Sequence, residues 1–212
     1  MKAIKKGNSY FIAILAILVA ICLSFISIIP LSKLSQIQSL FNPTQIISNL
    51  PLWIFMNSIL CFYSKSQKEA SIHTTLFNIA YFLSYIGFSI VLKNTTPNTL
   101  FLTWTIWTCI AAIVSYFIWN AQKSNTEGIL FTILLLTLFA YTAFTSTKDW
   151  ILSISLLNLC LYIYLIILLY KGKKETIILV LLSLILGVLL HSWTIQIIFT
   201  KSACINFYSM LL

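Results

Sequence analysis

Two apolar runs joined by a short basic loop make up the stretch from Asn49 to Tyr85, and this pattern predicts a membrane helical hairpin. Pro51 stands where the first turn of a helix tolerates a missing N–H group, and Trp53 follows at the depth of a membrane interface. The first run stops at the polar sequence 64–69, and the second begins soon after it. The rest of the chain repeats this plan, so the hairpin is the unit from which we build the fold.

The composition excludes an ordinary water-soluble domain. Of 212 residues, 60% are hydrophobic and 8% are charged, whereas soluble domains have roughly 25% charged residues. The chain has 4 acidic residues and 2 histidines, which leaves few groups for acid–base catalysis. We therefore expect no enzyme, no catalytic residue and no cofactor.

Seven apolar runs follow one another, and an apolar run of about 20 residues matches the hydrocarbon core of a bilayer. We predict an all-α integral membrane helical bundle of seven transmembrane helices, which forms a single polytopic domain over residues 1–212. Because the second run is short, six spans with a re-entrant second segment is the alternative. The sequence at about 31–42 is expected to be a short interfacial helix outside the membrane. The runs are Tyr10–Ile29, about Leu50–Tyr63, Thr74–Leu92, Leu100–Trp119, Gly128–Phe144, Trp150–Tyr170 and Thr176 to about Phe199.

The lysines predict the orientation, because short cytoplasmic loops of membrane proteins carry an excess of positive charge. The chain contains thirteen lysines and no arginine, and most of the lysines lie on one side of the seven runs. We therefore expect a cell membrane protein with a cytoplasmic N-terminus and an extracellular C-terminus. This topology accounts for the net charge of +9, so we expect no nucleic-acid partner. On the richer side lie Lys2, Lys5, Lys6, Lys65, Lys68, Lys123, Lys171, Lys173 and Lys174; on the other lie Lys33, Lys93, Lys148 and Lys201.

Polar side chains recur at helical spacing within several runs, and in a bilayer such faces turn toward other helices. One interpretation is that they line a cavity for a small ligand or a lipid group. The other is that they are packing and hydrogen-bonding seams, which are common in helical bundles. The candidate ligand-binding residues are Asn57, Asn78, Tyr81, Asn158 and His191.

The histidines and cysteines carry no recognisable catalytic or metal-binding pattern. His191 is a titratable group within a run and is a candidate proton relay or ligand-binding residue, with a neutral histidine bonded to a neighbouring helix as the alternative. His73 is expected at the membrane interface, where water can solvate it. Cys61 and His73 invite comparison with membrane-embedded cysteine peptidases, but the chain lacks a recognisable orienting acid or oxyanion loop. The five cysteines are widely spaced, which predicts neither a zinc site nor a redox pair.

Pairs of small residues four positions apart allow helices to approach closely. Within one chain we expect them to pack neighbouring spans rather than a dimer. The pairs are Ala80 and Ser84, Ala111 and Ser115, and Ser183 and Gly187.

A resemblance to a known group rests on interface residues of the second to fifth runs. The quoted positions are Asn49 to Trp53, Tyr63 to Ser66, Ala70, Tyr85, Trp104 to Trp119, Ala121 to Lys123 and Gly128. In these positions the chain resembles a family of small uncharacterised multi-span membrane proteins, a domain-of-unknown-function family from low-GC Gram-positive bacteria. The resemblance covers about residues 46–190. In the fourth run, Ala111, Ala112 and Ser115 stand where that family would have glycines. The resemblance implies the multi-span architecture and no known functional residue.

For function, the sequence favours a non-enzymatic membrane protein that acts through helix–helix contacts, as an accessory, immunity or stress-associated component. Its expected partners are the lipid bilayer and other membrane proteins. The alternative is a small-solute or lipid-handling permease without an ionised intramembrane site, which would use the five candidate residues. Neither interpretation names a ligand.

Overall fold

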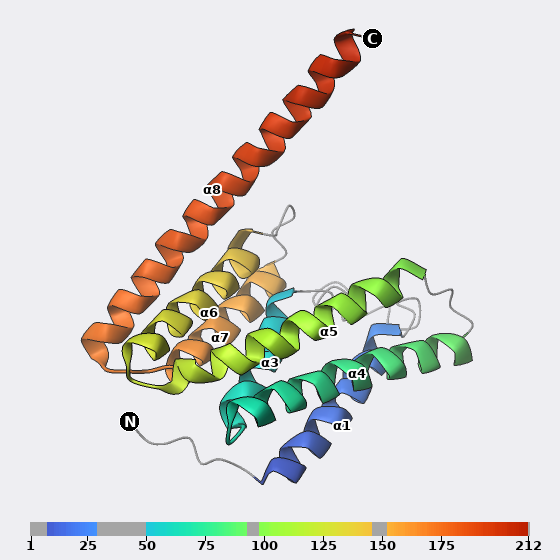
Figure 1. Ribbon diagram of the computed structural model, residues 1–212, viewed down its shortest axis with the longest axis vertical. Coiled ribbons are helices and arrows are strands. Elements are labelled where there is room, and N and C mark those ends of the chain that lie inside the picture. Colours follow the sequence, from blue (N-terminus) through green and yellow to red (C-terminus); the bar gives the residue numbers. More distant parts are fainter. Residues whose placement is uncertain (1–7, 29–49, 93–97, 146–151, 212) are drawn as a thin grey trace.

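The computed structural model describes residues 8–28, 50–92, 98–145 and 152–211; of residues 98–101, 144–145, 152–155 and 193–211 it describes the backbone. Over these ranges the chain forms seven α-helices and no strand (Figure 1). The all-α prediction is therefore confirmed, whereas the predicted interfacial segment at about 31–42 lies outside the described residues. The elements are α1 (Ser9–Ile28), α3 (Leu50–Tyr63), α4 (Gln67–Val91), α5 (Asn98–Ile118), the 3-10 turn η2 (Trp119–Gln122), α6 (Thr126–Thr145), α7 (Leu152–Leu168) and α8 (Lys173–Leu211).

Five of the helices, α1, α4, α5, α6 and α8, are long and apolar enough to cross a membrane. The other two, α3 and the apolar part of α7 at Leu156–Leu168, are shorter. With 14 residues, α3 rises about 21 Å, less than the hydrocarbon thickness of about 30 Å. Each of the seven helices corresponds to one of the seven predicted runs. Because α3 is short, a re-entrant segment is still an alternative for the second run, which forms α3.

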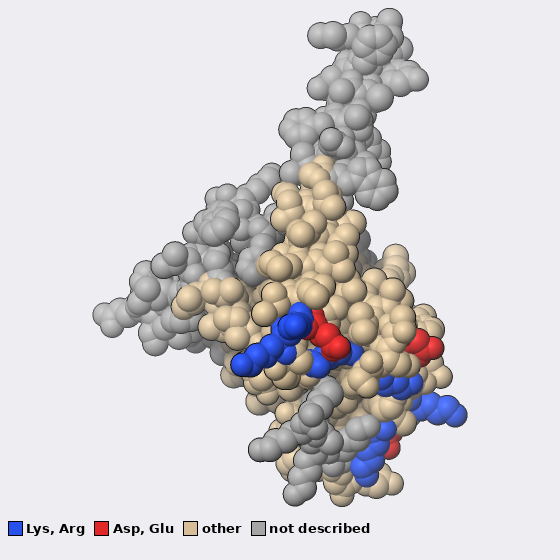
Figure 2. Space-filling model, turned by 90° about the vertical axis from the view of Figure 1, so that its left-hand side faces the viewer, with Lys and Arg blue, Asp and Glu red and all other residues tan. Residues whose placement is uncertain are grey.

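The outward surface of the bundle is apolar, as a membrane location requires. Side chains such as Leu83, Ile90, Leu130 and Ile178 are more than 60% exposed. Exposed apolar surface of this extent is not stable in water and belongs in contact with lipid. The charged side chains that the structure describes lie in loops or in the first turns of helices, and Figure 2 shows them gathered over one region. The protein is thus a membrane protein, with its described charges outside the apolar zone.

Three loops meet at one end of the bundle, which we call the basic end. The Trp119 indole donates a hydrogen bond to the Ser64 carbonyl oxygen, 3.0 Å away. The Lys171 ammonium donates to the carbonyl oxygen of Lys123. Burial lowers the pKa of Lys171, and the Glu175 carboxylate opposes this change. These bonds join the α3–α4, α5–α6 and α7–α8 connections, which sequence analysis assigned to a single side of the membrane.

The loop between α3 and α4 is shorter than the predicted segment 64–69, because α4 begins at Gln67. Ser66 caps this helix: its hydroxyl accepts a hydrogen bond from the backbone N–H of Glu69, at 3.2 Å. The Glu69 carboxylate in turn accepts from the backbone N–H of Lys65, at 3.0 Å. This reciprocal capping explains why the helix starts within a polar sequence.

The last helix is longer than predicted. We expected the seventh span to end at about Phe199, with a short tail, but α8 continues to Leu211 over 39 residues. After Gly187 the sequence contains no glycine and no proline, so neither of the two strongest helix-breaking residues stops it. At 1.5 Å per residue α8 is about 58 Å long.

The helices form two packed groups around the short α3. In one, α4 packs along both α1 and α5; in the other, α6 packs along α8 and α7. The two groups meet through α3, which contacts α4, α5, α6 and α7. Although η2 joins α5 to α6, these two helices share few contacts and diverge from their hairpin (Figure 1).

Small residues bring neighbouring helices of the bundle together. Gly187 of α8 is close enough to α6 that an added Cβ would lie 3.3 Å from the Cβ of Ala140. Ala111 and Ser115 of α5 are buried, and the Cys61 thiol of α3 donates to the Ser115 carbonyl oxygen at 3.1 Å. These two small-residue pairs pack helices of the same chain, as predicted.

Candidate functional site: the α5–α6 groove

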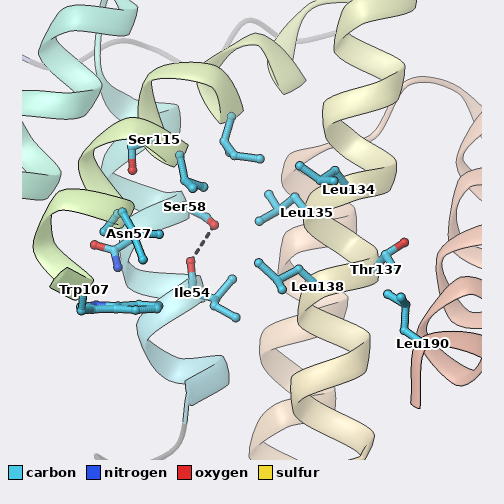
Figure 3. A pocket seen from close by; sticks show the side chains of 14 residues that line it. Ile54, Asn57, Ser58, Trp107, Ser115, Leu134, Leu135, Thr137, Leu138 and Leu190 are labelled. Atoms are coloured by element: carbon cyan, nitrogen blue, oxygen red, sulfur yellow. Dashed lines mark hydrogen bonds between the residues drawn. The ribbon is translucent and has the colours of Figure 1, made fainter. Parts of the chain in front are cut away.

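A pocket of about 290 Å³ lies where α5 and α6 diverge. We call this pocket the α5–α6 groove. Helix α3 forms its floor, α5 and α6 form its walls, and Leu190 of α8 reaches its edge (Figure 3). The lining includes Ile54, Asn57 and Ser58 of α3, Trp107, Ile110, Ala111, Val114 and Ser115 of α5, and Leu134, Leu135, Thr137 and Leu138 of α6.

The mouth of the groove opens on the apolar outer surface of the bundle. Its rim residues Ile110, Val114, Leu134 and Leu138 are 48%, 38%, 56% and 42% exposed, and they belong to the apolar outer surface of the bundle. The lining contains no charged side chain. An ion placed there would lose its hydration without gaining a partner, which is strongly unfavourable. The groove is therefore suited to an apolar, uncharged occupant.

The sequence creates this hollow by placing small residues where α3 meets α5. Ser58 satisfies its hydroxyl within its own helix, by donating to the carbonyl oxygen of Ile54 at 2.6 Å. Ala111 and Ser115 present little volume on the facing side of α5. The two backbones can thus approach each other, while the larger Leu135 and Leu138 extend from α6 toward them (Figure 3). The remaining space between the three helices is the groove.

The amide of Asn57 is a polar group in this mainly apolar lining, and it links the groove to a second buried amide. Asn57 is 8% exposed and Asn78 is fully buried. The Asn78 side-chain N–H donates to the Asn57 side-chain oxygen at 3.1 Å and to the Thr74 carbonyl oxygen at 2.8 Å. Two of the five predicted site residues are thus brought together.

Tyr81 lies on the same face of α4 as Asn78, in an aromatic cluster beyond the groove. Its ring centroid is 4.5 Å from that of Trp53 and 4.9 Å from that of Trp104. Its hydroxyl donates to the Ser27 hydroxyl oxygen at 3.3 Å. With 4% exposure, Tyr81 holds α1, α3, α4 and α5 together.

The other two candidates lie on helices of the second group. Asn158 of α7 is 1% exposed and donates to the Ala143 carbonyl oxygen of α6 at 3.2 Å. His191 is half-buried on α8. Neither residue lines the groove. The five candidates therefore do not surround a single pocket, and a ligand-binding role for Tyr81, Asn158 and His191 stays a prediction.

His73 differs from its expected position at a wet interface, because it is 2% exposed. Its Nδ1 lies 2.8 Å from the Ser64 hydroxyl oxygen, and its Nε2 lies 3.1 Å from that of Ser9. The first turn of α1 supplies Ser9 and covers the ring, which the sequence alone did not indicate. Among the described residues, His, Cys, Asp and Glu side chains form no group of three that could hold a metal ion.

Trp107 is one of the groove residues that sequence reasoning missed, as are Ser58 and Thr137. The Trp107 ring lines the groove, as the side chain of Asn57 does (Figure 3). The available signal was its position in the middle of an apolar run, away from the span ends where tryptophan usually lies. No protein-family model, curated protein or solved structure matches the chain. The resemblance to the uncharacterised bacterial family therefore stays a prediction, and the candidate site rests on its geometry.

Proposed function

We propose that the protein is a non-enzymatic, multi-pass component of the cell membrane that holds an apolar chain of a bilayer molecule in the α5–α6 groove. The observation that carries this proposal is the sideways opening of an uncharged pocket between two lipid-facing helices. This proposal corresponds to the lipid-handling alternative that the sequence analysis considered. Passage of a polar solute finds less support, because the groove offers few polar atoms along its length.

The proposal includes an orientation in which the basic end lies in the cytoplasm. The described lysines of that end support it, since positive charge is concentrated in cytoplasmic loops. In this orientation Asn57 and Trp107 lie near the middle of the bilayer. They stand 7 residues after the start of α3 and 9 after the start of α5, about 10 and 14 Å below those ends.

A photoreactive phospholipid with a diazirine in its acyl chain tests the occupancy of the groove. The full-length protein is reconstituted in nanodiscs with this lipid, irradiated, and mapped by peptide mass spectrometry. We expect labelling at groove residues such as Leu134 and Leu138, and loss of most of it in Leu138→Trp, which fills the pocket. Leu130→Trp, on the same helix but outside the groove lining, is the matched control. Equal labelling of Leu138→Trp and the unsubstituted protein would refute the proposal.

A second candidate function is the accessory role through helix–helix contacts, and the length of α8 favours it. Helix α6, on which α8 packs, has 20 residues, whereas α8 has 39. About half of α8 therefore extends beyond that contact, as Figure 1 shows. Purification of the full chain in mild detergent, followed by mass spectrometry, tests this role. We expect a second helical membrane protein to co-purify in a stoichiometric amount. Recovery of the chain alone as a monomer would contradict the accessory role.

A further inference from the structure

The groove lies in the half of the bundle that is next to the basic end. Along α5 its lining extends from Trp107 to Ile118, the last residue of the helix, which corresponds to about 16 Å. The lining residue of α6 farthest from the basic end is Leu138, about 18 Å from the start of that helix. Half of the hydrocarbon core of a bilayer measures about 15 Å. The floor and walls of the groove therefore lie within one leaflet, the leaflet at the basic end.

The outer surface between the basic end and the mouth of the groove is apolar. Phe117 of α5 and Phe131 of α6 stack there, with ring centroids 6.2 Å apart, and Phe117 is exposed. Along their helices the two rings lie between the basic end and the rim residues Val114 and Leu134. A hydrocarbon chain that starts at the basic end can thus reach the groove over these rings without passing a charged side chain.

The basic end carries an excess of positive charge. Among the side chains that the structure describes, six lysines and three glutamates lie there, an excess of three positive charges, and the lysines come from all three connections that meet at this end (Figure 2). Positive charge close to a membrane surface attracts anionic lipid head groups. The lysines are Lys65, Lys68, Lys123, Lys171, Lys173 and Lys174, and the glutamates are Glu69, Glu127 and Glu175.

Lys123 brings one of these charges close to the groove. Its ammonium lies 5.6 Å from the centre of the Trp119 ring, and Trp119 directly follows Ile118, which lines the groove. The Lys123 side chain is exposed. The Lys171 ammonium donates to the Lys123 carbonyl oxygen, so a second positive charge lies beside the same turn. A negative head group at the membrane surface next to the groove is therefore attracted by two neighbouring ammonium groups.

We propose that the groove holds one acyl chain of an anionic phospholipid from the leaflet at the basic end, with the head group at Lys123 and Lys171. The chain passes over Phe117 and Phe131 into the groove and ends near Trp107. The negative charge stays at the membrane surface, so the uncharged lining meets only hydrocarbon. The inference rests on the proposed function and adds the leaflet and the head-group class of the lipid.

Two photoreactive phospholipids that differ only in their head group test the charge. Phosphatidylglycerol and phosphatidylcholine with the same diazirine-bearing chain are added, each at the same low mole fraction, to phosphatidylcholine nanodiscs that hold the full-length protein. We expect phosphatidylglycerol to label Leu134 and Leu138 at least about fivefold more strongly. In the Lys123→Gln, Lys171→Gln double variant this preference should disappear. The Lys123→Arg, Lys171→Arg double variant keeps both charges and is the matched control, so it should keep the preference.

The position of the diazirine along the chain tests the leaflet. In a lipid from the leaflet at the basic end, a diazirine near the ester should label Phe117 and Phe131, and a diazirine at the chain end should label the α5 segment around Trp107. A lipid from the opposite leaflet would give the reverse order along α5. That reverse order would overturn the inference.

The remaining outcomes are interpreted once gel filtration shows that the variants are folded. Equal labelling of the groove by the two lipids would overturn the anionic-lipid inference and leave the proposed function intact. A preference that survives in the glutamine variant, or one that is lost in the arginine variant, would also overturn the inference, because the two lysine charges would then not be its cause. Absence of groove labelling by either lipid in the unsubstituted protein would remove the proposed function and the inference together.

Discussion

The side-chain amide of Asn78 donates a hydrogen bond to the side-chain oxygen of Asn57 across the contact between α4 and α3, with nitrogen and oxygen 3.1 Å apart. Hydrogen bonds between membrane helices contribute about 0.6 kcal/mol on average and at most about 1.7 kcal/mol. We expect Asn57→Ala and Asn78→Ala to show a coupling energy within this range in a double-mutant cycle. Unfolding in SDS gives the free energy of unfolding of the unsubstituted protein, of the two single variants and of the double variant. Asn57→Ala combined with Asn158→Ala is the control and should be additive.

Gly128 lies beneath the α5–α6 hairpin, and its replacement by alanine should destabilise the protein. An added Cβ would overlap the carbonyl oxygen of Lys123 and lie 2.9 Å from that of Asn120. Backbone atoms cannot move aside cheaply, so we expect a loss above the roughly 1–3 kcal/mol of ordinary overpacking. Thermal unfolding in detergent measures it. A Gly128→Ala protein as stable as the original would show that the hairpin is looser than described.

Gly87 provides the matched control, because nothing lies within 4 Å of a Cβ added there. It stands inside α4, where alanine is favoured over glycine by roughly 0.5–1 kcal/mol. Gly87→Ala should therefore leave the melting temperature unchanged or raise it. A large loss in both alanine variants would point to a general intolerance of substitution rather than to the hairpin.

The Tyr162 hydroxyl and the Ser183 hydroxyl are 2.8 Å apart and join α7 to α8 inside the second group of helices. Tyr162→Phe should lower the free energy of unfolding by about 0.6–1.7 kcal/mol, since the buried ring stays and one hydrogen bond is lost. Tyr116→Phe, at a tyrosine that is 37% exposed, should change it less. Equal effects of the two substitutions would contradict a stabilising role for the Tyr162 hydroxyl.

Reporter fusions test the orientation. A fused alkaline phosphatase is active when it lies outside the cell membrane, whereas a fused fluorescent protein gives its signal in the cytoplasm. Fusions after Lys68 and after Lys174 should both give the cytoplasmic signal, because both positions lie at the basic end. An exterior signal at either position is incompatible with the proposed topology.

Much of the fold was predictable because it depends on local patterns. Run lengths and interface residues gave seven helices, and helical spacing identified the faces that turn inward. Asn78, Tyr81 and Asn158 are indeed buried at 0%, 4% and 1% exposure. A polar side chain in an apolar run carries this information by itself, since contact with lipid would leave it without a hydrogen-bond partner.

The groove was not predictable in this way, because periodicity does not tell which helices meet. It arises where α5 and α6 diverge over the short α3, and this depends on contacts between residues far apart in the sequence, such as Cys61 with Ser115. The position of His73 illustrates the same limit. Its burial requires Ser9, which lies 64 residues away in the chain.

The arrangement in two groups of helices has a mechanical consequence. Since α5 and α6 touch little beyond their hairpin, a rotation of one group against the other about α3 widens or narrows the groove and changes the area that the protein occupies in the membrane plane. Lateral pressure from neighbouring acyl chains favours the smaller area, and stretching of the membrane favours the larger. For the proposed apolar occupant we therefore expect the occupancy of the groove to change with the tension of the bilayer.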